Sequence, residues 1–168
     1  RAVTGVRYTF AASYTNGLLP AGTYTFDGAG KMTQVPVLLA GTDFMNGLVR
    51  LPDGKVQYYV DGKNTFAGLV RSDAGDYYFI GPSKRALSNI TYTFPTKYTN
   101  GLLPAGTYTF DSTGKIAQLP ELLAGDDYRN GLVRMPDGKV QYFRNGQPAF
   151  AGLLKSNAGD YYFIDPTG

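Results

Sequence analysis

The string YTNGLLPAGTYTFD, residues 14–27, returns unchanged as residues 98–111. The two occurrences are 84 residues apart, and the 168-residue chain aligns with itself at this offset without a gap. Roughly two thirds of the paired positions are identical, which indicates a repeat architecture. We therefore predict two modules, residues 1–84 and residues 85–168.

Each module contains three smaller units with a shared pattern: Gly-Leu-aliphatic, a turn with Gly, an aromatic strand and a second turn. Aromatic and β-branched runs between Asn-Gly, Asp-Gly and Ala-Gly pairs are typical of β-hairpins. A single hairpin is only marginally stable, but stacked hairpins bury an apolar face. The sequence therefore predicts an all-β fold of tandem β-hairpin repeats, arranged as a solenoid-like elongated stack. The units begin at Gly17, Gly47 and Gly68, and again at Gly101, Gly131 and Gly152.

Pro52 and Pro136 precede Asp-Gly pairs, which suit a turn whose Gly has positive φ. The only candidates for helix are the short stretches 35–40 and 120–124, where we expect a loop or a single turn. Residues 90–94, ITYTF, alternate well and predict an additional strand.

The composition argues against catalysis. The chain has no Cys and no His, which excludes disulfides, thiolate metal sites and a Ser-His-Asp triad. Most of the Asp residues fall at turns, where Asp bonds to its own backbone. We expect a protein that is not an enzyme and needs neither a cofactor nor a metal.

The net charge of +3 favours anionic partners only mildly. Lys and Arg are dispersed, whereas nucleic-acid binding requires a clustered basic stripe, so we expect no nucleic-acid partner. No apolar run approaches the roughly 20 residues that span a bilayer, so we expect no membrane insertion.

The stretches YYVDGK at residues 58–63 and DYYFI at residues 76–80 resemble cell-wall-binding repeats. Such repeats occur in secreted choline-binding and glucan-binding proteins of bacteria and in the receptor-binding ends of clostridial toxins. The choline-binding members use Trp-rich cages, so this chain, which has no Trp, is similar to a Trp-less variant. The resemblance implies a hairpin solenoid, an extracellular or wall-attached setting, and a glycan or wall-polymer ligand.

Four aromatic pairs and two arginines are the candidate ligand-binding residues. Neighbouring side chains of a strand point to opposite faces, so one ring of each pair can fill the core while the other offers a stacking platform for a sugar. The alternative is that both rings only pack. The arginines recur at equivalent positions, as do Arg71 and Lys155, and could hold phosphates or simply discourage pairing of strand edges. The candidates are Tyr58, Tyr59, Tyr77, Tyr78, Tyr142, Phe143, Tyr161, Tyr162, Arg50 and Arg134.

These observations favour a non-catalytic segment of a secreted bacterial surface protein, located at the cell surface or in the wall. Its expected partner is cell-wall polysaccharide or another glycan. The alternative is a structural stalk or spacer, or a module that docks another protein.

Overall fold

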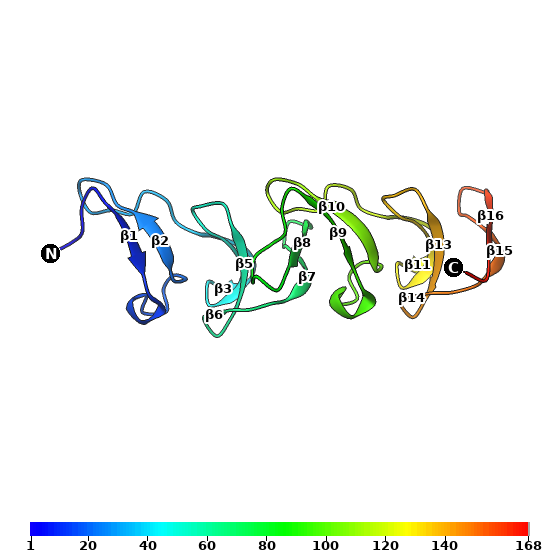
Figure 1. The fold of residues 1–168 in the computed structure, drawn as a ribbon, viewed down its shortest axis with the longest axis horizontal. Coiled ribbons are helices and arrows are strands. Elements are labelled where there is room, and N and C mark those ends of the chain that lie inside the picture. The colour runs from blue at the N-terminus through cyan, green and yellow to red at the C-terminus, as the bar shows by residue number, and fades with distance from the viewer. Residues whose placement is uncertain (168) are drawn as a thin grey trace. The chain divides into compact units, whose positions relative to one another are not determined.

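The computed structural model describes residues 1–167 of the chain. It is all-β and consists of small antiparallel sheets, which confirms the predicted fold class at the level of β-hairpins. The chain divides into two compact units, Arg1–Leu87 and Ser88–Gly168. Each unit contains one four-stranded sheet and two two-stranded hairpins (Figure 1).

The first unit holds eight strands and a short 3-10 helix. In chain order they are β1 (Arg7–Phe10), η1 (Ala12–Tyr14), β2 (Gly22–Thr25), β3 (Val37–Asp43), β4 (Asn46–Arg50), β5 (Val56–Val60), β6 (Lys63–Asn64), β7 (Gly68–Arg71) and β8 (Tyr77–Ile80).

The second unit repeats this order. Its elements are β9 (Ile90–Phe94), η2 (Thr96–Tyr98), β10 (Gly106–Phe110), β11 (Glu121–Asp127), β12 (Asn130–Arg134), β13 (Val140–Arg144), β14 (Gln147–Pro148), β15 (Gly152–Lys155) and β16 (Tyr161–Ile164).

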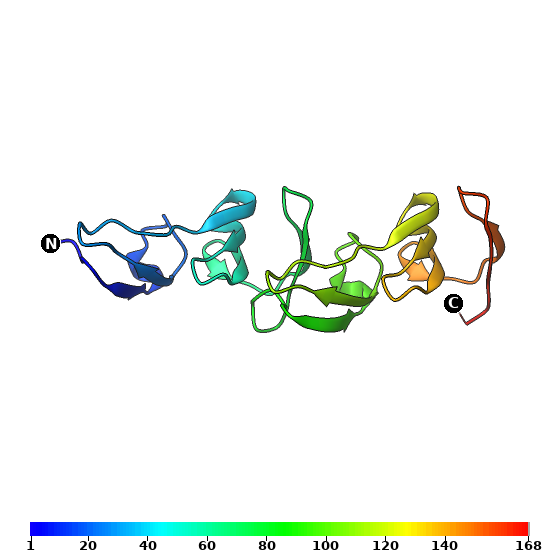
Figure 2. The same cartoon turned by 90° about the horizontal axis from the view of Figure 1, so that it is seen from above.

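Within each unit the four-stranded sheet is a meander that lies between the two hairpins, as both views show (Figures 1 and 2). In the first unit, β1–β2 precedes the β3-β4-β5-β6 sheet and β7–β8 follows it. In the second unit, β9–β10 and β15–β16 flank the β11-β12-β13-β14 sheet in the same way. Each four-stranded sheet therefore has a hairpin on either side.

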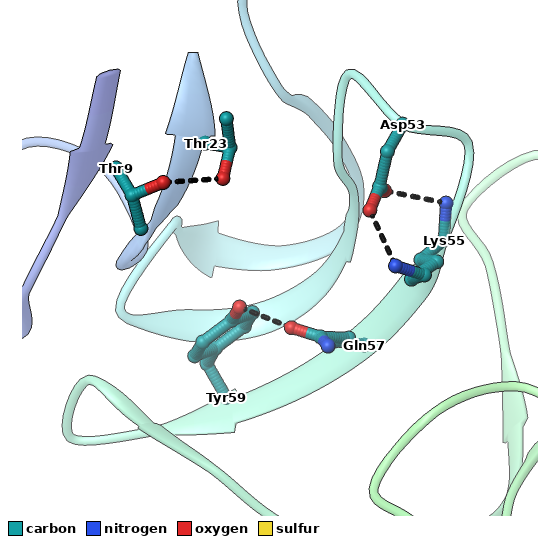
Figure 3. A network of polar contacts seen from close by, with 6 residues as sticks. All are labelled: Thr9, Thr23, Asp53, Lys55, Gln57 and Tyr59. Carbon is teal, nitrogen blue, oxygen red and sulfur yellow. Dashed lines mark hydrogen bonds and ion pairs between the residues drawn. The ribbon is translucent and has the colours of Figure 1, made fainter. Parts of the chain in front are cut away.

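The turn between β4 and β5 has the predicted Gly geometry. Gly54 adopts a φ of 85°, and Asp53 Oδ1 accepts a hydrogen bond of 3.0 Å from the backbone N–H of Lys55. Asp53 Oδ2 also lies 2.8 Å from Lys55 Nζ (Figure 3). Burial alone would raise the pKa of Asp53, but the hydrogen bonds and charge of Lys55 hold that pKa below its ordinary value. The prediction of a turn with positive φ at Gly54 is confirmed.

The repeated string forms a braced loop and one strand, not a complete hairpin. Its strand β2 pairs with β1, which precedes the string, and residues 17–19 lie in the loop between them. The hydroxyl of Tyr24 donates a 2.8 Å hydrogen bond to the Pro20 carbonyl, and Tyr108 repeats this bond to Pro104 at 2.9 Å. The unit pattern predicts that the Gly-Leu-Leu stretch, residues 17–19, is the first strand of a hairpin within the string, and this is wrong: these residues lie in the loop between β1 and β2.

The stretches 35–40 and 120–124 were predicted as loops or single turns, and this is wrong. They enter β3 and β11, which form the first strands of the four-stranded sheets. Pairing with β4 and β12 decides the conformation, because β-structure depends on cross-strand neighbours more than on local preference. The additional strand predicted at residues 90–94 is confirmed as β9.

Both faces of the first unit's four-stranded sheet are buried. Leu48 and Val56 pack with Tyr78 and Ile80 of β8 on one face. On the opposite face Tyr59 is buried, and its hydroxyl donates a 2.5 Å hydrogen bond to Gln57 Oε1 (Figure 3). The centre of the sheet is thus covered by an apolar cluster on one face and contains a buried, hydrogen-bonded tyrosine on the other.

Buried tyrosines should make the protein sensitive to alkaline pH. Burial raises the pKa of Tyr24 and of Tyr59 from 10.0 to about 12, and that of Tyr108 rises for the same reason. Because the folded state holds these protons more tightly, their stabilisation is complete below pH 10 and is lost as the pH rises towards about 12. The free energy of unfolding should fall by about 2 to 3 kcal/mol for each of Tyr24 and Tyr59 over this pH range.

Denaturant unfolding at a series of pH values, followed with tyrosinate absorbance, checks this expectation. The variant Tyr24→Phe should show a shallower decline above pH 10, because it lacks one of the titrating groups. A free energy of unfolding that stays constant up to about pH 12 would contradict the account.

Candidate functional site

Three of the predicted ligand-binding rings are core residues. Tyr59, Tyr78 and Phe143 are buried, so their faces are not available to a sugar. The prediction assumed that one ring of each pair lies on a solvent-facing side of its strand. This fails for β5 and β13 because both faces of the four-stranded sheets carry buried side chains, which places Tyr59 and Phe143 in the interior.

Three further candidates lie half-buried on inward faces. Tyr58 packs against the cluster formed by Leu48, Val56, Tyr78 and Ile80. Tyr142 and Tyr162 pack in the corresponding cluster of the second unit. These rings connect each four-stranded sheet to the hairpin that follows it.

Arg50 and Arg134 use their guanidinium groups inside the units. Arg50 Nη2 donates a 3.2 Å hydrogen bond to the Tyr78 hydroxyl, and Arg134 Nη2 donates one of 3.0 Å to Tyr162. Arg134 Nη1 also pairs with Glu121 Oε2 at 2.8 Å. The repeated arginines therefore link β4 to β8 and β12 to β16, which is a structural role visible in both units.

The remaining two candidates, Tyr77 and Tyr161, lie on the hairpin face opposite to the one that packs on the four-stranded sheet, and each lies beside a cation. On this face of the first unit Leu69 and Phe79 are buried and Tyr77 is half-buried. In the hairpin register Arg71 is opposite Tyr77, and Lys155 is opposite Tyr161. Arg71 Cζ lies 5.6 Å from the centre of the Tyr77 ring, and Lys155 Nζ lies 5.5 Å from that of Tyr161. We call these the cation–tyrosine pairs.

The loop beside each cation–tyrosine pair is held by a buried serine. Ser72 Oγ accepts a 3.0 Å hydrogen bond from the backbone N–H of Asp76, immediately before Tyr77. Ser156 Oγ accepts the equivalent bond of 3.1 Å from Asp160, immediately before Tyr161. This bond holds the start of the returning strand, next to the tyrosine.

Arg71 and Lys155 are absent from the predicted ligand-binding set, although their equivalence across the modules is visible in the sequence. The signal that identifies them is hairpin register. The residue three positions after the Gly of each Gly-Leu strand pairs with the first Tyr of the Tyr-Tyr-Phe strand. Two side chains that pair in this way lie on one face, so the cation and the ring must meet.

The cation–tyrosine pairs combine an aromatic face, a phenol hydroxyl and a positive charge. Tyrosine offers an apolar surface with a polar tip, and a neighbouring cation attracts phosphate or carboxylate. Tyr161 is 66% exposed and Tyr77 is half-buried, so both rings retain accessible surface. Within residues 1–167, no three acidic side chains gather into a site that could hold a metal ion.

No protein-family model matches the chain, and a search of curated proteins finds no match either. In the described part of the chain, no helix is long and apolar enough to cross a membrane.

Proposed function

We propose that the chain is a non-catalytic attachment module that binds an anionic glycan or cell-wall polymer outside a bacterial cell. The observation that supports this is the recurrence of the cation–tyrosine pair at equivalent positions, Arg71–Tyr77 and Lys155–Tyr161. The sugar ring stacks on the tyrosine, and the cation contacts a phosphate or carboxylate of the polymer. The resemblance to wall-binding hairpin repeats, and the solenoid-like stack that it implies, agree with such a role.

Each pair alone is a weak site. An exposed cation–aromatic contact contributes only about 0.5 to 1 kcal/mol, and a stacked ring adds an increment of similar size. Two linked sites on one polymer raise the overall affinity well above that of either site, because the second contact is intramolecular. A repeated ligand is therefore the chemical class that suits a repeated site.

Removing both rings tests the proposal. The double variant Tyr77→Ala/Tyr161→Ala should bind purified peptidoglycan that carries phosphate-rich wall polymer at least about tenfold more weakly, because both stacking surfaces are lost. Sedimentation of the insoluble wall material measures the bound fraction. Tyr14→Ala is the matched control, since Tyr14 is also an exposed tyrosine but lies outside the β7–β8 and β15–β16 hairpins.

A second experiment separates the ring from the charge. Arg71→Gln/Lys155→Gln should reduce retention most at low salt, because exposed charges are screened as ionic strength rises. Retention that stays at the wild-type level in both double variants would rule out the cation–tyrosine pairs as the binding surface.

A structural stalk or spacer is the second candidate. It is favoured by the internal hydrogen bonds that recur in both units, such as Tyr24 to Pro20 and Tyr108 to Pro104. A spacer has no ligand that prefers the folded state, so its melting temperature should not change with any glycan. A melting temperature that rises with wall-polymer concentration would exclude a pure spacer.

A further inference from the structure

A pocket of about 120 Å³ lies inside the second unit. It is lined by η2 and the loop that follows it, by the turn between β11 and β12, and by the turn between β13 and β14. Leu103 and Pro104 of the loop are buried and supply an apolar wall. Arg129 is exposed and supplies a positive charge. We call this the arginine pocket.

The side chain of Arg129 lies against two glycine turns. Its Nη1 is 3.3 Å from the position that a Cβ would take at Gly101, and its Nε is 3.6 Å from that position at Gly146. Within residues 1–167 no carboxylate forms an ion pair with this guanidinium. The nearby Asp127 carboxylate instead accepts 2.8 Å hydrogen bonds from the backbone N–H groups of Arg129 and Asn130. The guanidinium is therefore not neutralised by an acidic side chain.

The lining of the arginine pocket differs in one direction from the equivalent positions of the first unit. At each differing position an apolar or acidic side chain is replaced by one that donates hydrogen bonds. The pairs, first unit and then second, are Ala12 and Thr96, Phe44 and Tyr128, Met45 and Arg129, and Asp61 and Asn145. The other lining positions, including the two glycines and the apolar wall, are identical.

These differences change the charge of the pocket and not its framework. One negative charge is removed and one positive charge is added. Packing alone does not require the change, because Met45 covers the same turn in the first unit, where its Sδ lies 2.9 Å from a Cβ built at Gly62. The second unit has therefore acquired the electrostatics of an anion site.

We propose that the arginine pocket binds a small organic carboxylate. The planar guanidinium presents paired N–H donors that match the two oxygens of a carboxylate, and the Asn145 amide in the same lining offers a further donor. A short aliphatic group next to the carboxylate contacts Leu103 and Pro104, and the small volume suits a group of a few carbon atoms. Two sources supply this chemistry: a free short-chain acid and the carboxyl terminus of a peptide.

The arginine pocket shares no residue with the cation–tyrosine pairs. It is a separate site for a different ligand, and its donors belong to the second unit alone. Either proposal can therefore fail without the other.

Nuclear magnetic resonance of the backbone amides tests the proposal, because the amides of Gly101 and Gly146 lie beside the guanidinium. Titration with propionate and with N-acetyl-alanyl-alanine should give saturable shifts at both glycines, with Kd values in the millimolar range. The carboxamide form of the dipeptide should bind at least about tenfold more weakly, since it carries no negative charge. Tighter binding of the dipeptide assigns the pocket to peptide termini, and tighter binding of propionate assigns it to free acids.

Two variants place residues of the first unit in the pocket. Arg129→Met removes the charge and Asn145→Asp adds an opposing one, so each should weaken carboxylate binding at least about tenfold. The fold accommodates both residues, since Met45 and Asp61 occupy these positions in the first unit, and the φ of Asp61 is 48° against 51° for Asn145. Unchanged melting temperatures of the variants would verify that they fold.

Arg144→Val is the charge-matched control, because it also replaces an exposed arginine by the first unit's residue. Arg144 Cζ lies 6.0 Å from the centre of the Tyr142 ring, and Arg144 does not line the pocket. This variant should bind both carboxylates within about twofold of the wild type. The proposal would be overturned if neither carboxylate gave saturable shifts, if Arg129→Met bound them as the wild type does, or if inorganic phosphate bound more tightly than both.

Discussion

Tyr78→Ala should lower the free energy of unfolding by about 3 to 5 kcal/mol, the range for a large ring truncated in a packed core. Tyr78 is buried between β8 and the four-stranded sheet, and its hydroxyl accepts a hydrogen bond from Arg50. The adjacent Tyr77→Ala should cost about half as much or less, because Tyr77 is only half-buried. Equilibrium denaturant unfolding of both variants makes the comparison.

Tyr78→Phe separates the ring from its hydroxyl. This variant keeps the packing and loses the acceptor for the Arg50 N–H, so it should cost about 1 kcal/mol, within the range for one hydrogen bond. Equal destabilisation by Tyr77→Ala and Tyr78→Ala would contradict the assignment of Tyr78 to the core and of Tyr77 to a half-buried position.

Gly41→Ala should destabilise the first unit by about 2 to 4 kcal/mol, from a strained φ combined with overpacking. Gly41 has a φ of 109°, and a Cβ built there would lie 2.4 Å from the Asn46 carbonyl oxygen. Its cross-strand partner is Gly47, so the two backbones approach with no side chain between them. Gly125→Ala should behave alike in the second unit, where the corresponding distance to the Asn130 oxygen is 2.5 Å.

Gly28→Ala is the matched control for this prediction. No heavy atom lies within 4 Å of a Cβ at Gly28, and its φ is outside the positive range. Thermal and denaturant unfolding should therefore show little change for Gly28→Ala. A Gly41→Ala protein as stable as the Gly28→Ala protein would contradict the close backbone approach between β3 and β4.

The sequence was sufficient to predict the hairpins whose turns are determined by the turn residues themselves. Strands β4 and β5 pair across the Asp53-Gly54 turn, and β7 pairs with β8, as the pattern of Gly and aromatic residues predicts. Such turns determine the register of the strands that they join. It was insufficient for β3, because a stretch of Pro, Val, Leu and Ala carries no strong local preference and becomes a strand only by pairing with β4.

The candidate site shows the same limit. The alternation of side chains along β5 and β8 correctly places neighbouring rings on opposite faces of the strand. It does not determine whether a given face is exposed to solvent or covered by another hairpin. Tyr59 is buried for that reason, whereas Tyr77 keeps surface. The cation beside Tyr77 could have been predicted, since Arg71 follows from hairpin register alone.

The most direct test of the account is a titration of the protein, with isotope-labelled tyrosine, with poly(glycerol phosphate). Nuclear magnetic resonance monitors the tyrosine ring signals during the titration. The account predicts saturable shifts at Tyr77 and Tyr161, with the buried rings of Tyr24 and Tyr78 unchanged. Saturable shifts confined to other tyrosines, or no shift at all with this polymer or with phosphate-bearing wall fragments, would contradict it.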